Sequence, residues 1–112
     1  MTQAVEVVVF RAKEGISDHV LTDAAASANA EISLLDGFIS RDFGAADGQF
    51  IDIVHWRDMA AAKAAAEQVM KLPTCAAFFE LIDTKHMTFM HFDKVALSLP
   101  KNIWRGRTPV EN

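Results

Sequence analysis

The stretch DGFISRDFGAADGQFIDIVHWRD, residues 36–58, decides the fold of this 112-residue chain. Residues 38–43 and 49–57 both alternate between apolar and polar side chains, and the cluster GAADG at 44–48 separates them. Alternating runs joined by a short glycine-containing turn are typical of a β-hairpin. The sequence therefore predicts two neighbouring strands, over 38–43 and 49–57.

A helix is predicted on each side of this hairpin. Residues 17–35 place alanines and larger apolar residues at helical spacing, with Ser17 as a plausible N-cap and Asp36-Gly37 as the end. After the hairpin, Asp58 can cap a helix with six alanines between residues 60 and 66, which Pro73 stops. We expect this second helix to bury Met59, Ala62, Ala66, Val69 and Met70. Thr74 can cap a short additional helix.

Two further strands complete the pattern. Residues 4–11 form a β-branched run and residues 85–95 alternate, which favours a strand in each case. The order β, α, β, β, α, β is typical of an α+β, ferredoxin-like fold with a four-stranded antiparallel sheet. We expect one domain over 1–112, with a core at about 4–95 and a C-terminal tail over 96–112 that has no clear period.

The predicted strands carry apolar residues on both faces. Val7 and Val9 lie opposite Val8 and Phe10 on the first strand, and helices can cover only one face of such a sheet. Two copies packed sheet on sheet would bury the second face. The sequence therefore predicts a homodimer.

Composition excludes several classes of protein. The net charge is −4 with 23% charged residues, which argues against a nucleic-acid module because such modules need a basic surface. Cys75 is the only cysteine, so the chain cannot form an internal disulfide, a cysteine-based zinc site or an iron–sulfur cluster. No apolar run approaches the roughly 20 residues that span a membrane, and the N-terminus lacks a basic leader. We expect a cytoplasmic protein without a membrane partner.

Several motifs resemble those of one family, the antibiotic biosynthesis monooxygenases of the dimeric alpha-beta barrel superfamily. They are the valine-rich first strand, Asp-Gly-Phe at 36–38, His-Trp-Arg-Asp at 55–58, the alanine-rich helix, and the segment 72–83 with its paired phenylalanines. The resemblance covers about residues 4–95. It implies a dimer and, in some members, oxidation of polycyclic phenols without metal or flavin, so we expect no cofactor.

The same resemblance implies that Trp56 lines a substrate pocket, because it matches the tryptophan at the end of the family's third strand. Several of these enzymes place a Tyr or Asn nearby, and this chain contains no Tyr. In the haem-degrading branch a histidine after that tryptophan binds iron, but residues 58–83 contain none. The histidine spacing of the chain also offers no metal site.

Asp52 and His91 are the candidate catalytic residues. Asp52 lies mid-strand among apolar residues, and Glu6 would share its face from a parallel neighbouring strand, so the two carboxylates could raise one pKa and create a general base. The alternative is a structural pair of Asp52 with Arg41 across the hairpin. His91 is a possible proton relay or, alternatively, a hydrogen-bonded histidine of the core or an interface.

The predicted function is a small cofactor-independent monooxygenase that acts on an aromatic or polyketide-like molecule. The alternative is a non-catalytic dimeric domain that binds a small molecule or has a structural role, because this fold hosts both classes. The substrate would contact Trp56, Phe50, Val54, Glu6 and Phe89. Trp56 is as well suited to the core or an interface as to a pocket wall. Cys75 lies near a predicted helix start, and a small buried side chain is favoured there over a nucleophile.

Overall fold

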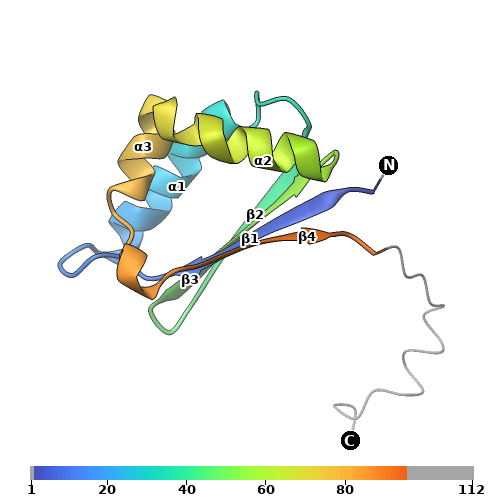
Figure 1. Cartoon of the computed structure of the whole chain (residues 1–112). Coiled ribbons are helices and arrows are strands. Elements are labelled where there is room, and N and C mark those ends of the chain that lie inside the picture. The colour runs from blue at the N-terminus through green and yellow to red at the C-terminus, as the bar shows by residue number, and fades with distance from the viewer. Residues whose placement is uncertain (1, 96–112) are drawn as a thin grey trace, which may run out of the picture.

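The chain folds as one antiparallel sheet covered on one face by helices, in a computed structural model that describes residues 2–95 (Figure 1). The strands are β1 (Ala4–Phe10), β2 (Phe38–Ala46), β3 (Gln49–Trp56) and β4 (Thr88–Asp93), in the order β2-β3-β1-β4. The helices are α1 (Asp18–Ile32), α2 (Met59–Gln68) and α3 (Pro73–Phe79). The predicted α+β, ferredoxin-like class is confirmed, and the predicted tail over 96–112 lies outside the described residues.

The hairpin of β2 and β3 is tighter than the sequence predicted. Ala45 and Ala46 still pair with β3, so β2 continues past Phe43 and the turn consists of Asp47 and Gly48 alone. Both turn residues have positive φ, 51° and 78°, as a two-residue type I′ turn requires. The predicted turn over 44–48 was therefore too long, because alanines can extend a strand when the turn itself needs only two residues.

The helix starts follow the predicted caps. The Ser17 hydroxyl accepts a hydrogen bond from the backbone N–H of Val20 at 3.2 Å, and the Asp58 carboxylate accepts one from Ala61 at 2.8 Å. Each bond satisfies an N–H that the first helical turn leaves without a partner. Helix α1 ends at Ile32, three residues before the predicted end at residue 35.

The buried stripe of α2 was predicted only in part. Ala61, Ala62 and Ala65 are buried, whereas Met59 and Ala66 are half-buried and Met70 is 53% exposed. Val69 is half-buried as well. Met70 leaves the stripe because α2 ends at Gln68 and a 3₁₀ turn, Val69–Lys71, changes the rotation per residue. The buried alanines have short side chains, which lets this helix approach the sheet closely.

The fourth strand is shorter than the predicted 85–95. Thr84–His86 forms a 3₁₀ turn that Asp83 caps by accepting a hydrogen bond from the Lys85 N–H at 3.0 Å. β4 then pairs with β1, which places the Phe89 and His91 side chains on the helix-covered face and those of Met90 and Phe92 on the opposite face.

The two faces of the sheet differ in whether helices pack against them. On the helix side, Phe10 lies in an aromatic core, with its ring centroid 5.6 Å from that of Phe50 and 5.8 Å from that of Phe78. Figure 1 shows the helices of the described residues on one side of the sheet, so none of them lies over the opposite face and its apolar side chains. They are Val5, Val7, Val9, Ile51, Ile53, Met90 and Phe92, of which Met90 and Phe92 are 47% and 44% exposed. Within residues 2–95, no helix has the length and apolar character needed to cross a membrane.

Candidate functional site

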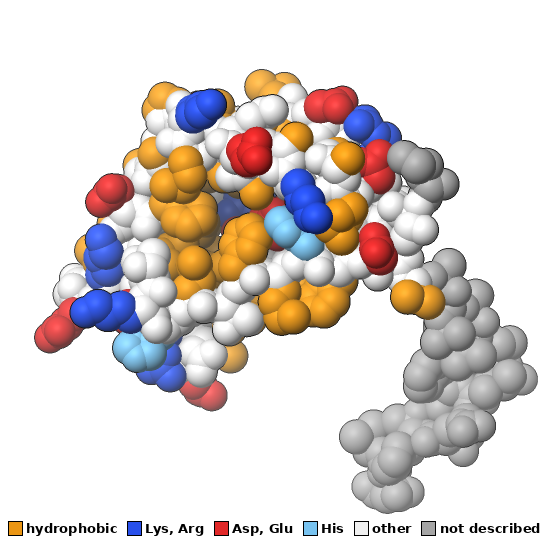
Figure 2. Space-filling view, in the orientation of Figure 1, with side chains coloured by type: hydrophobic (Ala, Val, Ile, Leu, Met, Phe, Trp, Pro, Cys, Tyr) orange, Lys and Arg blue, Asp and Glu red, His pale blue; other side chains and the backbone are white. Residues whose placement is uncertain are grey.

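A cavity of about 80 Å³ lies between the helix-covered face of the sheet and the helices α2 and α3. Its wall is mainly apolar and comes from segments far apart in the sequence. It consists of Glu6, Val8, Phe10, Ile32, Asp52, Val54, Trp56, Ala66, Val69, Met70, Cys75, Phe78, Phe79, Ile82 and Phe89. Figure 2 shows a hollow rimmed by hydrophobic side chains on the side where the helices meet β4.

Most of the residues predicted from the sequence to form a site line this cavity. The structure places Glu6, Asp52, Val54, Trp56 and Phe89 on its wall. Their convergence follows from the antiparallel pairing of β1 with β3 and β4, in which Glu6 lies opposite both Val54 and His91. The first and third strands were expected to be parallel when Glu6 was placed beside Asp52, and that expectation was wrong. Glu6 and Asp52 still share a face of the sheet, because the alternation of side chains along a strand does not depend on strand direction.

Two predicted residues do not line the cavity. Phe50 is 1% exposed and stacks on Phe10 in the aromatic core, with ring centroids 5.6 Å apart. His91 stands beside Glu6, and its ring meets that of Phe89 edge to face at 5.1 Å between centroids. Phe50 therefore supports the wall from the core, and His91 reaches the cavity only through Glu6.

Asp52 is held by Arg41. The Nε and Nη2 atoms of Arg41 donate to the two carboxylate oxygens of Asp52 at 2.9 and 2.8 Å, and Nη1 donates to the backbone carbonyl of Ala25 at 2.7 Å. The two side chains are 5% and 9% exposed. This bidentate contact favours a structural role for Asp52, paired with Arg41, over the role of general base, because both oxygens of Asp52 already accept hydrogen bonds from a cation.

Glu6 is less completely paired. Its Oε1 lies 3.2 Å from His91 Nε2, and the two side chains are 15% and 16% exposed. Burial raises the pKa of Glu6, the hydrogen bond and charge of His91 lower it, and the charge of Asp52 raises it, with a net increase. Glu6 thus combines a place on the cavity wall with a carboxylate whose charged form is disfavoured.

Trp56 presents a polar atom without a partner. The residue is 1% exposed, packs edge to face on Phe38 at 5.9 Å between ring centroids, and its indole Nε1 donates to no acceptor among the described residues. The N–H lies near enough to Glu6 to lower the pKa of that carboxyl without meeting hydrogen-bond geometry. A buried donor without an acceptor costs about 1–3 kcal/mol. On a cavity wall, it can bind an acceptor atom of a ligand.

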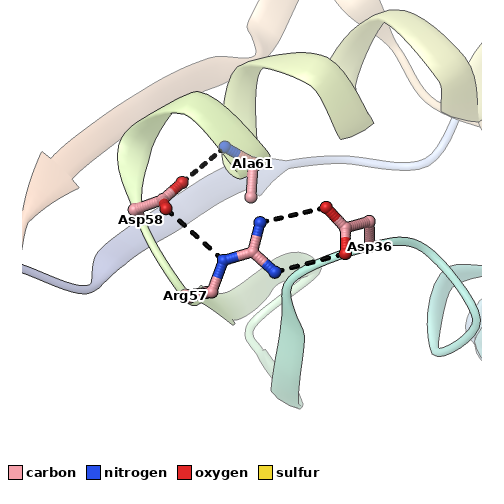
Figure 3. Close-up of polar contacts among 4 residues, drawn as sticks. All are labelled: Asp36, Arg57, Asp58 and Ala61. Carbon is pink, nitrogen blue, oxygen red and sulfur yellow. Dashed lines mark hydrogen bonds and ion pairs between the residues drawn. The ribbon is translucent and has the colours of Figure 1, made fainter. Parts of the chain in front are cut away.

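The end of β3 that carries Trp56 is anchored by the next residue, Arg57 (Figure 3). Its guanidinium donates to both Asp36 oxygens at 3.2 and 3.0 Å and to Asp58 at 3.4 Å. Its backbone N–H donates to the carbonyl of Gly37 at 2.7 Å. These contacts lower the pKa of Asp36 and tie the loop after α1 to the start of α2. The backbone at the end of β3, which carries Trp56, is therefore fixed to the neighbouring loop and helix.

The sequence did not reveal the wall that α3 and its neighbours supply. Cys75 is 2% exposed and lines the cavity, and burial raises the pKa of its thiol, in contrast to an activated nucleophile. Val69, Phe79 and Ile82 also line it. The sequence predicted burial of Val69 but assigned none of the three to a site. Among residues 2–95, no three side chains of His, Cys, Asp or Glu gather in a way that could hold a metal ion.

The comparison with solved structures identifies proteins of the same fold. No protein-family profile matches the sequence, and no curated protein is significantly similar to it. Among solved structures, SnoaB, a cofactor-independent oxygenase from Streptomyces nogalater, superposes with a TM-score of 0.72 at 19% identity, over 90% of this chain and 100% of that one. A putative antibiotic biosynthesis monooxygenase from Nitrosomonas europaea gives 0.67 at 11% identity, over 84% and 91%.

A second putative antibiotic biosynthesis monooxygenase, from Chloroflexus aurantiacus, gives a TM-score of 0.65 at 15% identity, over 87% of this chain and 97% of that one. The chain therefore has the fold of the antibiotic biosynthesis monooxygenases, as the sequence resemblance predicted.

Proposed function

We propose that this chain, which has the fold of the antibiotic biosynthesis monooxygenases, is a small cofactor-independent monooxygenase for an aromatic or polyketide-like molecule. The supporting observation is the mainly apolar cavity with the unpartnered N–H of Trp56 on its wall. An apolar wall with few polar groups is typical of a site for an aromatic ligand. The oxygen of a ring carbonyl or phenol would accept the Trp56 hydrogen bond.

The chemistry needs a carbon acid and dioxygen. A ring methylene flanked by aromatic rings loses a proton to a base, and the carbanion passes electrons to dioxygen, which is the oxidant. One oxygen atom then becomes the new carbonyl, and the other leaves as water with the two methylene hydrogens. A water-poor pocket with a donor beside the substrate oxygen stabilises the anion formed in the first step.

The size of the cavity bears on the substrate. Its volume of about 80 Å³ is below the roughly 300–1,000 Å³ of typical ligand sites. The bound ligand would therefore extend through the opening or displace side chains there. Met70, which lines the cavity and is 53% exposed, is suited to such a displacement because methionine is unbranched and flexible.

A homodimer through the uncovered face of the sheet is part of the proposal. Val7, Ile53 and Phe92 contribute to an apolar face that no described helix covers. In light scattering at micromolar concentration, the expected mass is twice the 12.3 kDa of one chain. Val7→Glu should shift the protein to monomers, whereas Asp42→Asn, an exposed position on the same face, should not. A monomeric wild type would overturn this part of the proposal.

Oxygen uptake tests the reaction. We would measure it with a panel of anthrones and quinols on the wild type, Asp52→Asn and Trp56→Phe. Trp56→Phe removes the N–H but keeps an aromatic ring, so uptake should fall while the fold is retained. The absence of uptake across the panel would count against the oxygenase, and an unchanged rate in Trp56→Phe would contradict the role of its N–H.

The second candidate is a non-catalytic domain that binds a small molecule in the same cavity. The pairing of Asp52 with Arg41 favours it, because that carboxylate is then unsuited to act as a base. Binding of an aromatic ligand without oxygen uptake would support it. For either function we propose a cytoplasmic location, with which the free, buried thiol of Cys75 is compatible.

A further inference from the structure

We propose that Glu6, positioned by His91, is the proton acceptor of the cavity and binds the acidic hydroxyl or carbon acid of an aromatic ligand. This inference rests on the proposed function for its substrate class. It replaces Asp52 in the role of base and assigns His91 a positioning role, because His91 does not line the cavity.

The two carboxylates on the cavity wall differ in how fully they are paired. Asp52 accepts two hydrogen bonds from Arg41, at 2.9 and 2.8 Å. Glu6 has one hydrogen bond, at 3.2 Å, with a histidine, and the nearby Trp56 N–H does not meet hydrogen-bond geometry with it. Both line the same cavity. Only Glu6 therefore has an oxygen available for a ligand hydroxyl.

Glu6 and Trp56 lie together on the wall of the cavity. Trp56 supplies a donor and Glu6 an acceptor on one wall, and both side chains are largely removed from solvent. A phenol or enol with a neighbouring carbonyl offers the complementary pair, an acidic O–H and an oxygen acceptor. When Glu6 takes the proton, the O–H bond of the ligand breaks, an O–H forms on Glu6, and the negative charge moves to the ligand beside the Trp56 N–H.

The charged and titratable groups around Glu6 set its proton affinity. They are His91 on β4, Asp52 on β3 with its partner Arg41, and Cys75 on α3 across the cavity. Burial raises the pKa of Glu6, which improves a carboxylate as a base, and His91 opposes this effect. Loss of His91 should therefore raise the pKa of Glu6 and move the acid limb of any Glu6-dependent process to higher pH.

Ligand binding tests the acceptor without requiring catalysis. The probe is 2-naphthol, and 2-methoxynaphthalene, which lacks the O–H, is its control. Glu6→Gln keeps the shape of the side chain and removes its charge, so it should weaken 2-naphthol binding about tenfold and leave 2-methoxynaphthalene unchanged. In the wild type, 2-naphthol affinity should fall as pH drops through the pKa of Glu6, and in Glu6→Gln it should not depend on pH. Glu67→Gln, the same change at an exposed position, should match the wild type.

Equal 2-naphthol affinity in the wild type and Glu6→Gln would overturn the inference, whatever the oxygen uptake. A Glu6-dependent affinity together with no uptake from any anthrone would refute the oxygenase and leave the acceptor site standing. Where uptake occurs, Glu6→Gln should lower kcat by at least about a hundredfold, and His91→Gln should move the acid limb of the kcat profile to higher pH. An unmoved acid limb would refute the positioning role of His91.

Discussion

Asp52→Asn should act on stability rather than directly on chemistry. The Arg41 and Asp52 side chains are 5% and 9% exposed and share two hydrogen bonds of 2.9 and 2.8 Å. Removing one partner of a buried ion pair costs about 3–5 kcal/mol, because the other charge stays buried. Asparagine retains one accepting oxygen, so we expect the lower limit, about 3 kcal/mol. At about 4–8 °C per kcal/mol for a domain of this size, Tm should fall by roughly 12–24 °C.

Thermal and urea unfolding followed by circular dichroism at pH 7 would measure this loss. Asp42→Asn is the matched control, since it is the same substitution on the neighbouring strand at an exposed position, and it should change stability by less than about 0.5 kcal/mol. The double variant Arg41→Met/Asp52→Leu removes both charges and should unfold at a higher temperature than Asp52→Asn alone.

The opposite outcome would be informative. An Asp52→Asn protein with an unchanged Tm and no oxygen uptake would refute the structural role of the pair and restore Asp52 as the candidate base. A double variant less stable than Asp52→Asn would show that the pair does more than neutralise its own buried charges.

Three further perturbations follow from the structure. Gly15 and Gly37 both have left-handed φ, 87° and 86°, but only a Cβ at Gly37 would stand 2.5 Å from the Cβ of Ala61. In urea unfolding, Gly15→Ala should lower the free energy of unfolding by about 1 kcal/mol, and Gly37→Ala should lower it by at least twice as much. Equal losses would contradict the close packing at Gly37. Cys75 should react with iodoacetamide far more slowly in the native than in the urea-unfolded protein, because it is 2% exposed and burial raises its pKa; rapid native labelling would contradict its burial. The pKa of Glu6 in the folded protein is raised above its ordinary value of 4.5. The protonated Glu6 side chain therefore contributes its full stability below pH 4.5, and this stability is lost as pH rises through the folded-state pKa. Glu6→Gln should therefore gain stability relative to the wild type on going from pH 4 to pH 7 in chemical denaturation, and an equal difference at both pH values would refute this linkage.

The element order was predictable because local patterns carry it. Period-two alternation identified the hairpin, and Ser17 and Asp58 marked the starts of two helices that the structure confirms. The ends were predicted less well, because they depend on contacts that a local pattern does not contain. The pairing of Ala45 and Ala46 with β3, for example, decides where β2 ends.

The site was predictable only to the level of shared faces. Alternation places Asp52, Val54 and Trp56 on one side of their strand, and the structure shows that this side meets the cavity. The partners of the charged groups depend on strand register and sheet order. The contact of Glu6 with His91 joins residues 85 positions apart. No local pattern indicates it, because it exists only when β1 lies between β3 and β4.

The two carboxylates on the cavity wall differ in how far their burial is compensated, and this difference locates the functional group. A buried charge is retained without large cost when a cation and several hydrogen bonds satisfy it, as Arg41 does for Asp52. Glu6 has a single hydrogen bond, with His91, and burial raises its pKa. A group that costs stability and faces a cavity is a candidate for function, because function rather than folding then accounts for its presence. By this argument Asp52 belongs to the framework of the cavity, and Glu6 to its chemistry.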